Sequence, residues 1–101
     1  MTDQLLSDFR ARRGDRIWTV AQLEDVSDER VSSTFRDALM DTGEDEIIKI
    51  EILKSLVRRP ESPSEHDKMG RVLLNLFAND SDVLIRQFVA KALRRYLDAH
   101  A

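Results

Sequence analysis

The sequence predicts an all-α fold, an α-α superhelix of about six helices arranged in two to three repeats. The chain carries one helical pattern twice: Asp45 to Arg59 (DEIIKIEILKSLVRR) matches Asp82 to Tyr96 (DVLIRQFVAKALRRY), an offset of 82 − 45 = 37 residues. Self-similarity at such a period is typical of stacked helical hairpins. With only 3 glycines and 2 prolines, the chain also lacks the turn residues that an all-β fold requires. Alternating strand patterns are absent.

A third and weaker copy lies upstream. It aligns when Leu23 is placed under Leu56, an offset of 56 − 23 = 33 residues. Asp15 then falls where the other copies have isoleucine, so this copy is degenerate. Terminal repeats are expected to be atypical because one of their faces meets water. Two interpretations stay open: three repeats, over approximately 1–25, 28–58 and 65–98 of a single domain, or two repeats preceded by an unrelated cap.

The first two predicted helices cover residues 3–13 and 16–25. Gly14 stands at the position that often ends a helix in the left-handed conformation. The second helix has an alternative start, with Thr19 as N-cap and Gln22 as its capping-box partner. Both helices are short, and the apolar residues of the first lie on one side. These apolar residues are Leu5, Leu6 and Phe9.

Ser27 and Ser64 are the predicted N-caps of the third and fifth helices. The segment RPESPS is the clearest predicted loop, because it holds two prolines and two serines within six residues. Apolar residues recur at i, i+3, i+4 and i+7 on either side of it, which favours amphipathic helices. The four remaining predicted helices cover residues 28–40, 45–58, 65–78 and 82–98.

Lys49 and Arg86 occupy the same repeat position and fall inside the apolar arc of their helices. A cation at a buried position requires a partner, because an unpaired buried charge is costly. The acidic turns before each helix offer Asp41 or Asp45 to Lys49, and Asp80 or Asp82 to Arg86. We therefore expect structural ion pairs that join the repeats, in preference to a ligand-binding role for these cations.

Each good copy reads helix, short acidic turn, helix, and its second helix begins with Asp followed by Ile-Lys or Ile-Arg. This pattern resembles the HEAT-like, armadillo-type repeats of the short type found in bacterial proteins and in relatives of phycobilisome lyases. The resemblance covers roughly residues 16–97. It implies a helical solenoid that holds a partner on the concave face formed by its second helices, and it implies no particular activity. The residues that carry it are Asp45, Ile48, Lys49, Ile52, Leu53 and Leu56, repeated as Asp82, Ile85, Arg86, Val89, Ala90 and Leu93.

The same resemblance implies a partner-binding face. Exposed aromatic and arginine side chains are typical anchors of protein interfaces. For Trp18 and Phe88, burial under the chain ends is the competing interpretation. The candidate protein-binding residues at equivalent repeat positions are Trp18, Glu51, Lys54, Arg58, Phe88, Lys91 and Arg95.

The last helix also predicts an assembly contact. Leu84, Phe88 and Ala92 form an apolar stripe at i, i+4 and i+8, with polar neighbours along its edge. Apolar stripes of this kind mark association surfaces. We expect either the concave groove or a two-fold homodimer through the last helix.

Other functional classes find little support. There is no cysteine for thiolate chemistry and no glycine-rich phosphate loop, and neither of the 2 histidines has a ligand at metal-site spacing. We therefore expect no enzyme activity, cofactor or metal. The net charge of −3 disfavours nucleic-acid binding, and no apolar run is long enough to span a membrane. The leading interpretation is a cytoplasmic protein-binding scaffold, adaptor or regulatory subunit. The alternatives are a nucleic-acid-binding module and, from the resemblance alone, a bilin-lyase-type chaperone subunit.

Overall fold

The computed structural model describes residues 1–98, and that part of the chain is all-α, as the sequence predicts. No strand occurs between residues 1 and 98. The helices fall where the periodicity places them, and their bounds differ from the expected ones by a few residues. The six helices are α1 (Thr2–Arg10), α2 (Arg16–Leu23), α3 (Glu29–Met40), α4 (Glu46–Ser55), α5 (Pro63–Asn79) and α6 (Val83–Asp98).

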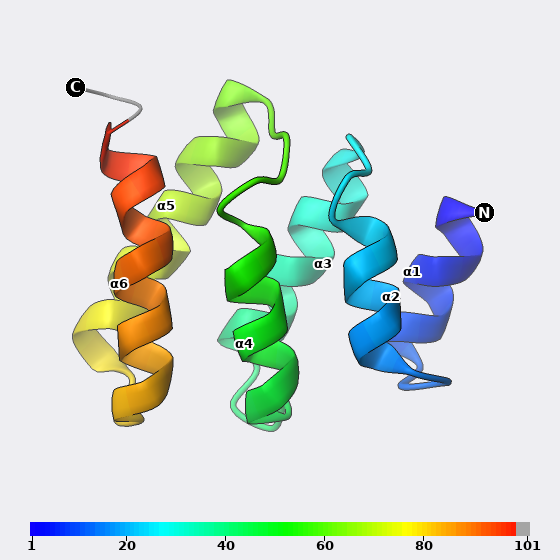
Figure 1. Ribbon diagram of the computed structural model, residues 1–101, viewed down its shortest axis with the longest axis horizontal. Helices are drawn as coiled ribbons and strands as arrows, with labels where there is room; N and C mark the ends of the chain where they lie inside the picture. The colour runs from blue at the N-terminus through cyan, green and yellow to red at the C-terminus, as the bar shows by residue number, and fades with distance from the viewer. Residues whose placement is uncertain (99–101) are drawn as a thin grey trace.

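The helices lie in two layers that alternate along the chain (Figure 1). Helices α2, α4 and α6 lie side by side in front, and their N-termini share the lower edge of the view. Helices α1, α3 and α5 form the second layer, in which α3 contacts both α1 and α5. The turns therefore collect at two edges. Those near residues 11–15, 41–45 and 80–82 lie at the lower edge, and those near 24–28 and 56–62 lie at the upper edge.

The core lies between the two layers and continues along the whole row of helices. Phe9 of α1 packs edge-on against Phe35 of α3, with ring centroids 6.3 Å apart. Each fully buried large apolar side chain contributes about 1.5–3 kcal/mol to folding, so this row is the main source of stability. The fully buried apolar side chains include Leu23, Val31, Phe35, Leu39, Ile52, Leu56, Met69, Leu73, Val89 and Ala92.

Each front-layer helix begins at an aspartate that caps it. The carboxylate of Asp15 accepts from the backbone N–H of Trp18 at 3.0 Å, and that of Asp45 accepts from Ile47 at 2.8 Å. Asp82 accepts from Leu84 and Ile85 in the same way. Caps of this kind satisfy helix N–H groups that have no partner within the helix.

Three predicted caps are wrong. Thr19 lies inside α2 and is buried, because Asp15 already supplies the cap. The N-cap of α3 is Asp28, one residue after Ser27. The N-cap of α5 is Ser62 instead of Ser64, because Pro63 suits the first helical position, where its missing N–H costs nothing.

The start of α2 also explains why the first copy looks degenerate. At the offset of 33 residues, Arg16 corresponds to Lys49, which lies within α4 after Ile48. Helix α2 therefore lacks the first turn of its counterpart. Asp15 occupies the isoleucine position because it caps a shorter helix.

A candidate protein-binding surface

Most of the predicted binding residues lie on the outward side of the front layer, and Phe88 and Arg95 are the exceptions. We call this surface the even-helix face and define it by its outward-facing, mostly exposed positions on α2, α4 and α6 and in the turn after α4. Because the three helices run side by side, the face is continuous across the front of Figure 1. Its residues are Trp18 and Gln22, then Glu51, Lys54 and Arg58, then Leu84, Gln87, Lys91 and Arg94.

Trp18 is the aromatic side chain that the even-helix face exposes on α2. It is 51% exposed, and its neighbour Ile17 is 45% exposed. The expectation that Trp18 is buried under the N-terminal helix is wrong, because α1 packs on the opposite, core-facing side of α2 through Leu5, Leu6 and Phe9. A tryptophan is a large apolar surface to leave in water, and such residues anchor protein interfaces.

A shallow groove separates α2 from α4 on this face, with a volume of about 130 Å³. Val20, Ala21 and Ser55 contribute to its lining. Two ion pairs lie along it: Lys54 binds Glu51 at 3.2 Å, and Arg58 binds Glu24 at 3.2 Å. In each pair the basic side chain is exposed to solvent, so each pair contributes at most about 1 kcal/mol to stability.

Helix α6 contributes cations beside a half-buried aromatic ring. The Lys91 Nζ lies 5.2 Å from the centroid of the Phe88 ring. Phe88 packs against the core and is only partly accessible. Lys91 and Arg94 are exposed, and neither forms an ion pair with another described side chain.

Arg95 is not the free interface side chain that the repeat register predicts. It is half-buried, and its guanidinium donates to the backbone carbonyls of Leu56 and Arg59. These carbonyls end α4 and would otherwise lack partners. Arg95 therefore ties α6 to the turn after α4, whereas its counterpart Arg58 is exposed.

The apolar stripe on α6 is also corrected. Ala92 is fully buried and Phe88 is half-buried, while Leu84 alone of the three is 44% exposed. These side chains lie on the side of α6 that faces α4, as the Arg95 contacts show. Within this stripe only Leu84 is open to solvent, and the two-fold homodimer stays a prediction.

The predicted ion pairs of Lys49 and Arg86 do not form within residues 1–98. Asp45 and Asp82 cap helices instead, and Arg86 is exposed, with its Nε donating to the carbonyl of Phe77 at 3.1 Å. The Arg86 guanidinium lies 5.5 Å from the Phe77 ring centroid. Lys49 is half-buried and lines a cavity of about 370 Å³ at the lower edge. The long stems of these side chains cover apolar surface while their charges stay near water, so no acid is required.

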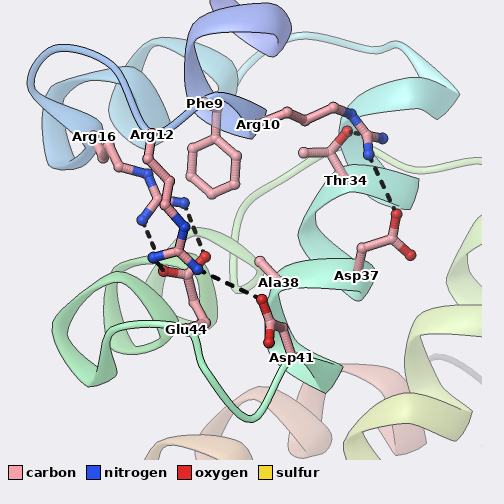
Figure 2. A pocket seen from close by; sticks show the side chains of 9 residues that line it. All are labelled: Phe9, Arg10, Arg12, Arg16, Thr34, Asp37, Ala38, Asp41 and Glu44. Atoms are coloured by element: carbon pink, nitrogen blue, oxygen red, sulfur yellow. Dashed lines mark hydrogen bonds and ion pairs between the residues drawn. The ribbon is translucent and has the colours of Figure 1, made fainter.

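A network of arginines and acids at the lower edge is a second candidate site (Figure 2). Arg16 donates to both carboxylate oxygens of Glu44, at 2.7 and 2.8 Å, and its guanidinium lies 4.4 Å from the Phe9 ring centroid. Arg12 adds longer ion pairs to Glu44 and Asp41, at 3.7 and 3.6 Å. These residues line a cavity of about 180 Å³.

Every arginine of this network faces an acid, so it does not attract anions strongly. The hydrogen bonds from Arg16 lower the pKa of Glu44, and the same bonds raise the pKa of Arg16. The pairs link the turn after α1 and the first residue of α2 to the turn after α3 (Figure 2). Their role is to hold two hairpins together.

A third polar cluster lies at the upper edge around Arg59, which is 1% exposed. Its guanidinium donates to the carbonyls of Val26 and Asp28 and to the Ser32 hydroxyl, at 2.8, 3.2 and 3.0 Å. Burial lowers the pKa of Arg59. Nearby, the Tyr96 hydroxyl donates to Glu61 at 2.7 Å, and burial raises the pKa of both groups.

Sequence reasoning missed Arg59, although the repeat register contains the signal. At the offset of 37 residues, Arg59 corresponds to Tyr96, a large buried side chain in both the pattern and the structure. Position 59 was therefore a buried position occupied by a cation.

No catalytic or metal-binding constellation stands out beside these clusters. Within residues 1–98, no three histidine, cysteine or acidic side chains come together in a way that could hold a metal ion. Over the same residues, none of the helices combines the length and the apolar character needed to cross a membrane. Family models, curated proteins and solved structures compared with the chain gave no match.

Proposed function

We propose that this chain is a non-enzymatic scaffold or adaptor, a short HEAT-like stack that holds a partner protein against its even-helix face. The observation that carries the proposal is the exposure of Trp18, at 51%, on a continuous face that also presents Lys54, Arg58 and Lys91. Aromatic and basic side chains on one rigid surface are what protein interfaces use as anchors.

The layered packing supports the repeat part of the proposal. Helices α2, α4 and α6 contact one another in sequence, and α3 contacts α1 and α5. The 33- and 37-residue offsets also bring buried positions into register, because Leu23, Leu56 and Leu93 are all buried. Stacks of hairpins bury a continuous core between neighbours and leave one helix of each hairpin for binding.

Site-specific cross-linking tests the proposal. A photoreactive phenylalanine analogue is placed at Gln22 or Gln87 on the even-helix face, and at Arg71 or Asn75 on exposed positions of α5 as matched controls. Illumination in an extract of the source cells should give one discrete protein adduct from the face positions alone. Adducts of equal yield from α5, or none from the face, would contradict the proposal.

Nucleic-acid binding remains the second candidate because α6 carries several cations and no acid between Val83 and Tyr96. Phosphate contacts produce a steep dependence of affinity on salt concentration, so a salt titration with duplex DNA tests it. The cytoplasmic location, the lack of catalytic activity and the bilin-lyase alternative stay predictions.

A further inference from the structure

On the even-helix face, the cations and the acids that they pair with lie at different depths below the surface. In the groove between α2 and α4, the side chains of Arg58 and Lys54 are 78% and 55% exposed. Their acidic partners Glu24 and Glu51 are 19% and 30% exposed. The carboxylates therefore lie deeper than the cations they bind, and an approaching molecule meets positive charge first.

Helix α6 extends this positive layer over a long stretch without acidic residues. Between Val83 and Tyr96 the helix contains no Asp or Glu. Its exposed Lys91 and Arg94 have no ion-pair partner in the described part of the chain. The face is thus locally basic on a chain whose net charge is −3. The cations of this layer are Lys54, Arg58, Lys91 and Arg94.

Apolar surface lies among these cations. Val57 and Leu84 are 50% and 44% exposed, and Ile50 and Phe88 are half-buried against the core. Such side chains gain little from a purely ionic ligand, because removing apolar area from water requires an apolar partner. The complementary ligand carries carboxylates and apolar side chains together.

We propose that the partner binds through an acidic amphipathic segment, whose carboxylates face Lys54, Arg58, Lys91 and Arg94 and whose apolar side chains cover the residues between them. This inference rests on the proposed function and specifies its partner class. Charge complementarity of this kind speeds association and excludes wrong partners more than it adds affinity. A polypeptide fits better than nucleic acid, because Glu24 and Glu51 lie beneath the cations and apolar residues lie between them.

Defined peptides test the partner class. The first probe is a labelled helical peptide of about five turns with Glu and Leu interspersed along one face and neutral polar residues on the other. The second replaces every Glu with Lys, the third is polyglutamate of equal length, and the fourth is single-stranded DNA of equal charge. Fluorescence anisotropy should rank the Glu–Leu peptide first. Its affinity should fall as ionic strength rises from about 50 to about 300 mM, because salt screens exposed charges.

Charge-reversal variants locate the site. Lys91→Glu and Arg94→Glu should each weaken binding of the Glu–Leu peptide by about tenfold, because a like charge then faces its carboxylates. Arg71→Glu on α5 is the matched control, since it makes the same charge change at an exposed position of the other layer. Circular dichroism confirms that all three variants fold. Equal weakening by Arg71→Glu would show a non-specific effect of net charge and would overturn the inference.

The peptide and cross-linking experiments test different claims, so one claim can be refuted while the other stands. If adducts form at the even-helix face but the Glu–Leu peptide binds no better than its Lys counterpart, the acidic segment is refuted and the adaptor function stands. If the peptide binds but no face adduct forms, the adaptor function falls. Tighter binding of the DNA than of the Glu–Leu peptide would refute the polypeptide partner in favour of nucleic acid.

Discussion

The two edges of the molecule hold their helices together by opposite electrostatic solutions. At the lower edge, Arg16 and Glu44 form a bidentate ion pair whose side chains are 12% and 3% exposed. At the upper edge, Arg59 is more deeply buried and is held by two backbone carbonyls and a hydroxyl. The lower edge neutralises the charge of Arg16 with an acid, whereas the upper edge stabilises the charge of Arg59 with neutral dipoles.

The difference shows in the pKa values of the acids at the two edges. The hydrogen bonds from Arg16 lower the pKa of Glu44, because they favour the charged carboxylate. Glu61 lies near Arg59, Arg95 and His66, which all lower its pKa, yet burial outweighs them and its pKa is raised. Proximity to cations therefore does not decide the sign of the shift. At Glu44 the hydrogen bonds from Arg16 decide the sign, whereas at Glu61 burial outweighs even the direct hydrogen bond from Tyr96.

Removing the buried cation should cause the largest loss of stability. Arg59→Ala leaves two carbonyls and the Ser32 hydroxyl without their donor in a buried site. We expect the free energy of unfolding to fall by about 3 kcal/mol or more, as measured by urea unfolding. The neighbouring Arg58→Ala is the control, and its effect should stay within about 1 kcal/mol because Arg58 is exposed. Equal effects of the two substitutions would mean that the upper-edge contacts contribute nothing.

Breaking the lower-edge pair should cost somewhat less. Glu44→Ala leaves Arg16 without its bidentate partner and removes one of the two acids that Arg12 faces. We expect about 2 kcal/mol, because the pair is not fully buried. A double-mutant cycle with Arg16→Met separates the pair from its surroundings. A coupling energy near zero would show that the pair only fills space.

The two edges also show which features the sequence predicts, the helices, and which it misses, the caps and the ion pairs. The amphipathic periodicity placed all six helices because apolar spacing is a local property of the chain. The caps were missed by one or two residues where Asp28 and Ser62 competed with other good cap residues. The aspartates of the repeat were read as ion-pair partners, but backbone N–H groups of the next turn are closer to them than any cation.

The exposure of the candidate binding residues was predicted in part for the same reason. Trp18, Lys54, Arg58 and Lys91 are accessible as expected, because helical position alone determines which side of α2, α4 and α6 they occupy. Arg95 was misplaced because its hydrogen bonds run to carbonyls 36 and 39 residues away, which no local pattern reveals. Long-range contacts of this kind decide whether an arginine is structural or free.

Removing a single hydroxyl at the upper edge should have a modest effect. Tyr96→Phe keeps the ring stacked on His66, with centroids 4.2 Å apart, but deletes the donor to Glu61. We expect a loss of about 1 kcal/mol by urea unfolding, the usual net value of one hydrogen bond. Tyr96→Leu, which also removes the ring, is the comparison and should cost more. A neutral Tyr96→Phe would show that Glu61 does not use this donor.

The smallest expected effect is on the pH dependence of stability, and it should have opposite signs at the two edges. Because the folded-state pKa of Glu44 is lowered below 4.5, its contribution is full above that pH and is lost as the pH falls through the folded value. Because the folded-state pKa of Glu61 is raised above 4.5, its contribution is full below that pH and is lost as the pH rises through the folded value. Glu44→Gln should therefore make the free energy of unfolding depend less on pH below about pH 4.5. Glu61→Gln should make it depend less on pH above about pH 4.5. Urea unfolding between about pH 3 and about pH 7 measures both slopes. If Glu61→Gln flattened the acid side instead, the cations around Glu61 would outweigh its burial, and the two edges would work by the same electrostatics after all.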